Sequence, residues 1–108
     1  MIKFKETENR LDIEYTKGDT FEFTVISTDY IPEGSYMRLQ ISLDGYMDDI
    51  IIEKSIPVKD NVFVVLLEEQ FTDLLKLNRV YQHRFTFYDV TGRKITTISG
   101  NLIIKWGA

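Results

Sequence analysis

The sequence predicts one small all-β domain spanning residues 1–108, an immunoglobulin-like antiparallel β-sandwich with one short helix. A chain of 108 residues can build one hydrophobic core but is too short to stabilise two. Aromatic residues make up 13% of the chain, and Ile, Val and Thr are frequent, which favours strands. Short segments with alternating apolar and polar residues recur, separated by turn residues, as in a sandwich of short strands.

The first half of the chain contains three segments in which apolar and polar residues alternate, as in strands that bury one face. A turn at 17–19 separates the first two segments, and a turn containing Pro32 and Gly34 separates the second from the third. The segments cover residues 4–15, 20–28 and 36–44, and their inward faces are predicted to hold Leu11, Ile13, Tyr15, Phe21, Phe23, Val25, Met37, Leu39, Ile41 and Leu43.

The middle of the chain predicts two further strands and the helix. The first strand begins at Ile50 and ends near Pro57, and the second, 62–67, is apolar at every position, as in a central strand covered on both sides. An amphipathic helix of about two turns is predicted next, at one end of the sandwich. Its apolar face would comprise, at i, i+4, i+7 and i+8, Leu67, Phe71, Leu74 and Leu75.

The last part of the chain predicts the longest hairpin. Two alternating segments, 80–90 and 94–106, flank a turn at 89–93, and Gly100 is predicted to mark a bulge or a kink. About seven or eight strands result, which suits a two-sheet sandwich, with a small closed barrel as the alternative. The Cys, Trp, Cys pattern of true immunoglobulin domains is absent, so the predicted likeness concerns architecture only.

Composition excludes several classes of function. The chain has no Cys, which excludes a disulfide framework, a thiolate metal site and a Cys nucleophile. Its net charge is −4 and Lys and Arg do not cluster, so we expect no nucleic-acid partner. We also expect no signal peptide and no contact with a membrane, because no long apolar segment is present.

The candidate catalytic and metal-binding residues are few. His83 is the only His, and no nucleophile in its sequence context suggests a triad, so we expect a partly buried side chain bonded to a neighbouring strand rather than a general base. The acidic segment 44–49 could hold calcium, but it lacks the EF-hand spacing and a solvated loop explains it equally well. The prediction is therefore a protein without catalytic residues, metal or cofactor.

Tyr and Trp side chains are the main candidates for recognition, since each combines an apolar ring with a polar tip. Most are expected to pack in the fold. Trp106, close to the end of the sequence, is the preferred interface residue, and Tyr46 and Tyr88 are further candidates.

Three stretches together resemble a known family. The first is KGDTFEFTV at 17–25, the second is LLKL at 74–77 followed by VYQHRFTFY at 80–88, and the third is GRKITTISGNLII at 92–104. This order of a G-D-T strand opener, a helix, a hairpin and a closing strand resembles the N-terminal domain of phage baseplate upper proteins. It is also similar to other small tail or baseplate proteins of phages and prophages of Gram-positive bacteria. Family members usually have a Gly before the Tyr of the penultimate strand, where this chain has Arg79-Val80.

The resemblance implies a non-enzymatic structural or assembly protein of a bacteriophage or prophage tail or baseplate. Such a protein would be assembled in the host cytoplasm, would reside in the virion and would bind other tail proteins, commonly in several copies, so a homo-oligomer is one expected arrangement. The alternative hypothesis is a carbohydrate-binding or host-adhesion module on the same sandwich, suggested by the many Tyr residues and Trp106. A third hypothesis, an enzyme subunit or inhibitor, would require a deep pocket where carboxylates or His83 converge.

Overall fold

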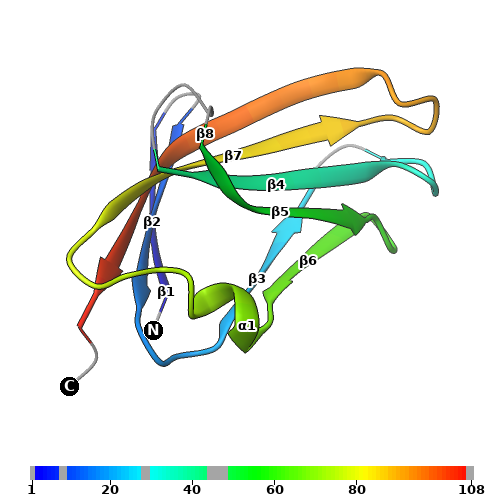
Figure 1. Cartoon of the computed structure of the whole chain (residues 1–108). Coiled ribbons are helices and arrows are strands. Elements are labelled where there is room, and N and C mark those ends of the chain that lie inside the picture. Colours follow the sequence, from blue (N-terminus) through cyan, green and yellow to red (C-terminus); the bar gives the residue numbers. More distant parts are fainter. Residues whose placement is uncertain (1, 8–9, 28–29, 44–48, 107–108) are drawn as a thin grey trace.

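The structure, a computed structural model, describes residues 2–7, 10–27, 30–43 and 49–106 (Figure 1). Within these ranges the chain forms eight strands and one short helix, so a mostly-β fold with one helix is confirmed. The elements in chain order are β1 (Ile2–Thr7), β2 (Arg10–Thr16), β3 (Phe21–Ile26), β4 (Tyr36–Ser42), β5 (Ile50–Pro57), β6 (Val62–Leu67), α1 (Glu69–Thr72), β7 (Val80–Tyr88) and β8 (Lys94–Lys105).

The strands form a six-stranded sheet, ordered β1-β2-β8-β7-β4-β5, and a two-stranded sheet, β3-β6. The pairing of β2 with β8 is parallel, whereas the other pairs are antiparallel. The prediction of an all-antiparallel fold is therefore wrong at this pair. After β2 the chain crosses to the small sheet, which leaves one edge of β2 free for the last strand (Figure 1). The result is a mixed sheet facing a small one, which is not clearly an immunoglobulin sandwich.

The core lies between the two sheets. Aromatic rings join them, with centroids 5.8 Å apart for Phe23 and Phe85 and 5.4 Å apart for Phe63 and Phe87. The alternation in the sequence explains this layer, because every second residue of a strand points to the same face. The buried apolar residues are Ile13, Tyr15, Phe21, Met37, Leu39, Ile41, Ile52, Ile56, Val58, Phe63, Val65, Leu67, Leu75, Tyr81, Phe85, Phe87, Leu102 and Ile104.

Two predictions about burial are wrong in detail. Leu43 was expected to face the core, but its side chain is 44% exposed, and Ser42 is buried instead. The register of β4 against β5 shifts between Ile41 and Ser42, and such an irregularity interrupts the period of two on which the prediction relied. In β6, Val64 is 50% exposed, because no described element covers the outer face of the small sheet.

The helix is shorter than predicted. After α1, the amides of Leu74 and Leu75 bond to carbonyls three residues back, those of Phe71 and Thr72, so the chain tightens and the helical period is lost. Leu75 is consequently buried and Leu74 exposed, although both were placed on one helix face. The Nζ atom of Lys17 donates hydrogen bonds to the carbonyls of Thr72 (2.8 Å) and Leu75 (2.7 Å), which fixes this segment at one end of the fold. No helix among the described residues is long and apolar enough to span a membrane.

Of the predicted bulge or kink at Gly100, the bulge is not found, since the β7–β8 register is regular there, and the residue marks a close approach of two strands. A Cβ atom at this position would overlap the carbonyl group of Leu11 on β2. The register shift between β7 and β8 lies elsewhere, between Phe87 and Tyr88. The absence of a side chain at Gly100 therefore permits the contact between β2 and β8.

Candidate functional site

His83 is part of the structural frame. Its side chain is 1% exposed, and it lies opposite Gly100 in the pairing of β7 with β8. The Nε2–H group passes this glycine and donates to the carbonyl of Leu11 at 2.5 Å. The ring also packs against Phe85, with centroids 4.8 Å apart. The hydrogen bond thus links β7 to β2 across β8, which is a structural use of the imidazole.

Burial sets the protonation state of His83. Loss of solvation on burial lowers its pKa from 6.5, and the bond to Leu11 opposes this effect without cancelling it. A second proton would have to sit on Nδ1, which is buried and has no hydrogen-bond partner. The nearby carboxylate of Asp12 is already engaged, because its Oδ1 accepts from Arg10 Nε (3.1 Å) and from the amide of Asn101 (2.9 Å). The surroundings of the imidazole therefore favour its neutral form.

The acidic segment 44–49 lies almost entirely outside the residues that the structure describes. Residues 44–48 lie outside the described part of the chain, and Asp49 is exposed. Among the residues that are described, no group of three or more His, Asp or Glu side chains is placed to hold a metal ion.

The predicted interface residues are not brought together. Tyr46 lies outside the described residues, so the structure does not place it. Trp106 follows the end of β8 and is 71% exposed. Tyr88 lies at the other end of the β7–β8 ladder, where it pairs with Lys94.

Tyr88 belongs to a polar layer on the outer face of the large sheet. Its ring stacks on Tyr36 with centroids 4.9 Å apart, and the guanidinium carbon of Arg38 lies 5.4 Å from its centroid. In the same layer, the guanidinium of Arg84 donates to Gln40 Oε1, and Gln40 Nε2 donates to Glu53. These side chains thus satisfy one another, and the ring of Tyr88 is already in contact with two neighbours.

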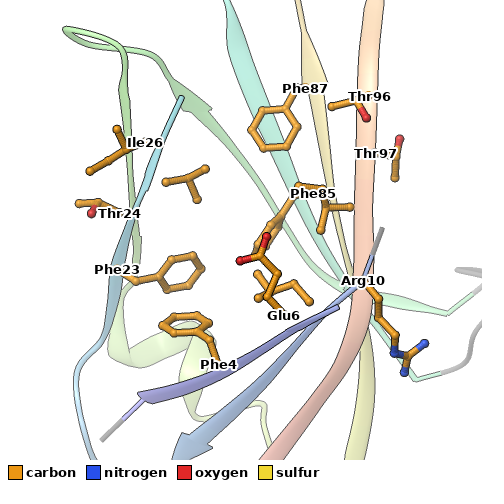
Figure 2. Close-up of a pocket in the computed structure, with 13 residues that line it drawn as sticks. Phe4, Glu6, Arg10, Phe23, Thr24, Ile26, Phe85, Phe87, Thr96 and Thr97 are labelled. Carbon is orange, nitrogen blue, oxygen red and sulfur yellow. The ribbon is translucent and has the colours of Figure 1, made fainter. Parts of the chain in front are cut away.

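The most distinctive surface feature is a cleft of about 620 Å³ at the side of the fold, which we call the aromatic cleft. Figure 2 shows Phe23, Thr24 and Ile26 of β3 on one side of it and Thr96 and Thr97 of β8 on the other. The complete lining comprises Phe4, Glu6, Arg10, Leu11, Phe23, Thr24, Val25, Ile26, Phe85, Phe87, Thr96, Thr97 and Ile98.

Aromatic contacts shape the cleft. The ring of Phe4, on edge strand β1, meets that of Phe23 edge to face with centroids 5.1 Å apart. Phe4 is nevertheless partly exposed. Phe85 and Phe87 come from the inner face of β7. The cleft therefore continues the core of the sandwich to the surface.

The chemistry of the cleft fits binding better than catalysis. Its two charged side chains are Glu6 and Arg10, and Arg10 is paired with Asp12. Glu6 makes no ion pair or hydrogen bond with the described residues. A single carboxylate among Phe, Leu, Ile, Val and Thr side chains lacks the paired acid and base that general acid–base chemistry needs.

A second cleft, of about 420 Å³, lies where the β2–β3 turn meets α1. Two of its charged side chains already serve the fold, since Lys17 bonds to the carbonyls of Thr72 and Leu75 and Glu68 is paired with Lys54 at 2.9 Å. The bonds to Lys54 and to its own backbone lower the pKa of Glu68. These interactions account for Lys17 and Glu68 by structure alone.

The aromatic cleft was not predicted from the sequence. Phe4 stands between Lys3 and Lys5, and an aromatic residue in a charged edge strand is the one local sign of it. No protein-family model and no curated protein sequence matches this chain.

Proposed function

We propose that this protein acts by binding other proteins and not by catalysis, as an assembly component. The observation that supports this most directly is the outer face of the β3–β6 sheet, where apolar side chains face solvent. Ile26, Val64 and Leu66 are all exposed there. They come from adjacent strands, because Val64 pairs with Thr24, Leu66 with Glu22 and Val62 with Ile26. Apolar groups gathered on one face are typical of surfaces that a partner covers.

The proposed biological setting is a bacteriophage or prophage tail or baseplate. It rests on the resemblance of the three stretches: the first comprises the β2–β3 turn and most of β3, and the other two include β7 and most of β8. The partners would be other tail or baseplate proteins, with several copies per particle, and the protein would be assembled in the host cytoplasm and reside in the virion. We keep the immunoglobulin-like sandwich as part of this proposal, because two sheets enclose one core.

Co-purification tests the proposal. The protein would be co-expressed with the tail and baseplate proteins encoded near its gene, and complexes would be detected by light scattering after size exclusion. We expect a stable complex that is lost in a Val64→Lys/Leu66→Lys variant. A Val90→Lys variant changes an equally exposed residue outside the small sheet and serves as the control. A gene remote from tail genes, together with no complex formed, would contradict the proposal.

A carbohydrate-binding or host-adhesion module is the second candidate. The observation that favours it is the outer face of the large sheet, where Tyr36 and Tyr88 lie beside hydrogen-bonding side chains such as Gln40 and Arg84. Rings and amides of this kind suit sugar recognition. Titration with cell-wall polysaccharide while Tyr fluorescence is followed tests it, and no response at millimolar ligand would contradict it.

A further inference from the structure

The aromatic cleft lies beside the edge of the small sheet where β3 pairs with no described strand. Two strands, β3 and β6, face a sheet of six. Beside β3, the side chains of Phe85, Phe87 and Ile98 line a cleft instead of packing beneath a third strand. An isolated pair of strands is marginally stable in water, and a third strand is one way to stabilise it.

The two sides of the small sheet differ. On the β6 side, Lys54 of β5 donates to the carbonyl of Leu66 (2.6 Å) and to the carboxylate of Glu68 (2.9 Å), which ties the two sheets together. On the other side, the edge of β3 pairs with no described strand. Its link to β1 is the ring contact between Phe4 and Phe23.

The free edge of β3 offers main-chain partners. Alternate residues of an edge strand direct their N–H and C=O groups away from the sheet, where a further strand can pair with them. Residues Phe23 to Ile26 of this strand line the cleft. Figure 2 shows the side chains of Phe23 and Phe4 at one end of the cleft and that of Phe87 near the other. A strand added here would thus find hydrogen bonds on one side and apolar contacts beneath.

The charges near this edge indicate the kind of strand. Glu6 lies in the cleft, and Glu22 is exposed on β3. Neither makes an ion pair or hydrogen bond with the described residues, whereas Arg10 is paired with Asp12. The charged residue of the cleft lining that has no partner in the described part of the chain, Glu6, and the charged residue of β3, Glu22, are therefore both negative, which complements a basic side chain.

We propose that the aromatic cleft binds an extended segment of a partner protein, which pairs with the free edge of β3 as the third strand of the small sheet. Alternate apolar side chains of this segment enter the cleft, and a Lys or Arg lies near Glu6 or Glu22. Addition of a strand to an exposed sheet edge is a general mode of peptide recognition. The cleft volume of about 620 Å³ also lies within the range of ligand-binding sites. This inference rests on the proposed role in protein binding and assigns that role a site.

A synthetic peptide tests the site directly. The probe is a capped peptide of about nine residues in which Val and Thr alternate and Lys stands at each end, which matches strand length. We expect saturable binding below about 1 mM by calorimetry. In ¹⁵N-correlated spectra, we expect the largest shifts at Phe23 to Ile26 and at Thr96 to Ile98.

Two modified peptides examine strand pairing. One carries N-methyl groups on its Val amides and the other on its Thr amides, so that each lacks the hydrogen-bond donors of one edge. We expect one of them to bind like the parent peptide and the other to lose binding. Equal binding by both would overturn strand addition.

Two variants examine the charge. Glu6→Gln is expected to weaken the peptide about two- to fivefold, the range for exposed ion pairs. Glu33→Gln makes the same charge change in an exposed turn and should bind as the unmodified protein does. An equal effect of both changes would overturn the charge assignment.

The remaining outcomes separate this inference from the proposed function. No binding at millimolar peptide would overturn the strand site, and so would self-association through β3, because a second copy would then be the occupant. Complexes with tail proteins that form while the peptide does not bind would leave protein binding in place, at another surface. A peptide that binds although no tail protein does would support the site and contradict the phage setting.

Discussion

Replacement of Gly100 by Ala tests the contacts that hold β2, β8 and β7 together in the large sheet. The new Cβ would overlap the carbonyl carbon and oxygen of Leu11 and would come within 2.9 Å of Asp12 Oδ1. Neither neighbour can move without cost. The Leu11 carbonyl accepts from His83, and Asp12 Oδ1 accepts from the amide of Asn101, so a shift of β2 breaks the links to both β7 and β8.

The magnitude follows from these contacts. Extra volume at a packed position costs about 1–3 kcal/mol. A buried polar group left without its partner, here the imidazole or the carbonyl, costs about 1–3 kcal/mol more. We therefore expect Gly100→Ala to lose about 2–6 kcal/mol, a large part of the roughly 5–15 kcal/mol that stabilises a typical domain. A loss of 2 kcal/mol would lower the Tm by about 8 °C or more.

Urea denaturation and thermal unfolding measure this loss. The matched control is Gly18→Ala, where φ is +98° and no heavy atom lies within 4 Å of the new Cβ. The control should lose only the backbone cost of about 1–2 kcal/mol, and the NMR signals of the His83 ring should not move. A Gly100→Ala protein as stable as the unmodified one, or more stable than the control, would refute the close contact of Gly100 with β2 as a determinant of stability.

Three further predictions concern other named groups. Burial holds the pKa of His83 below 6.5, so the unfolded chain takes up the proton first, and stability should fall as the pH drops from about 7 to 5. This dependence of the free energy of unfolding on pH, up to about 1.4 kcal/mol per pH unit, should be absent when a His83→Gln variant is titrated with urea. Lys17→Met should lose about 1.5–3 kcal/mol in urea denaturation, because the carbonyls of Thr72 and Leu75 lose a charged donor; a loss near zero would contradict this. Asp89→Ala should speed hydrogen exchange at the amides of Thr91 and Arg93, which donate to this carboxylate, and should leave the centre of the hairpin protected.

Much of the strand layout could be predicted from the sequence, because alternation is a local property. Segment 36–42 places Met37, Leu39 and Ile41 on one face whatever its partners are, and the structure buries all three. The wrong predictions concern burial, which depends on the elements that pack against a strand and not on the strand alone. The apolar residues of 62–67 are equally compatible with a central strand covered on both faces and with a strand that has one exposed face, which the structure shows.

The candidate sites were harder to predict for the same reason. The bond between His83 and Leu11 depends on which strand lies beside β8, and no local pattern contains this information. The aromatic cleft exists where β3 pairs with a single strand of the described part of the chain, so it follows from topology and not from the residues of any one segment. Phe23 is predicted to face inward, and its place in the lining of the cleft explains why its side chain is only partly buried.

The parallel pairing of β2 with β8 has a consequence for folding in time. Asp12 and Asn101, which join the two strands, are 89 positions apart. The edge of β2 that does not pair with β1 therefore stays unpaired until β8 is in place. Closure of so long a loop is entropically costly, and proteins rich in such distant contacts fold slowly. During synthesis, the hairpin of β1 and β2 must therefore remain unincorporated until β8 has left the ribosome.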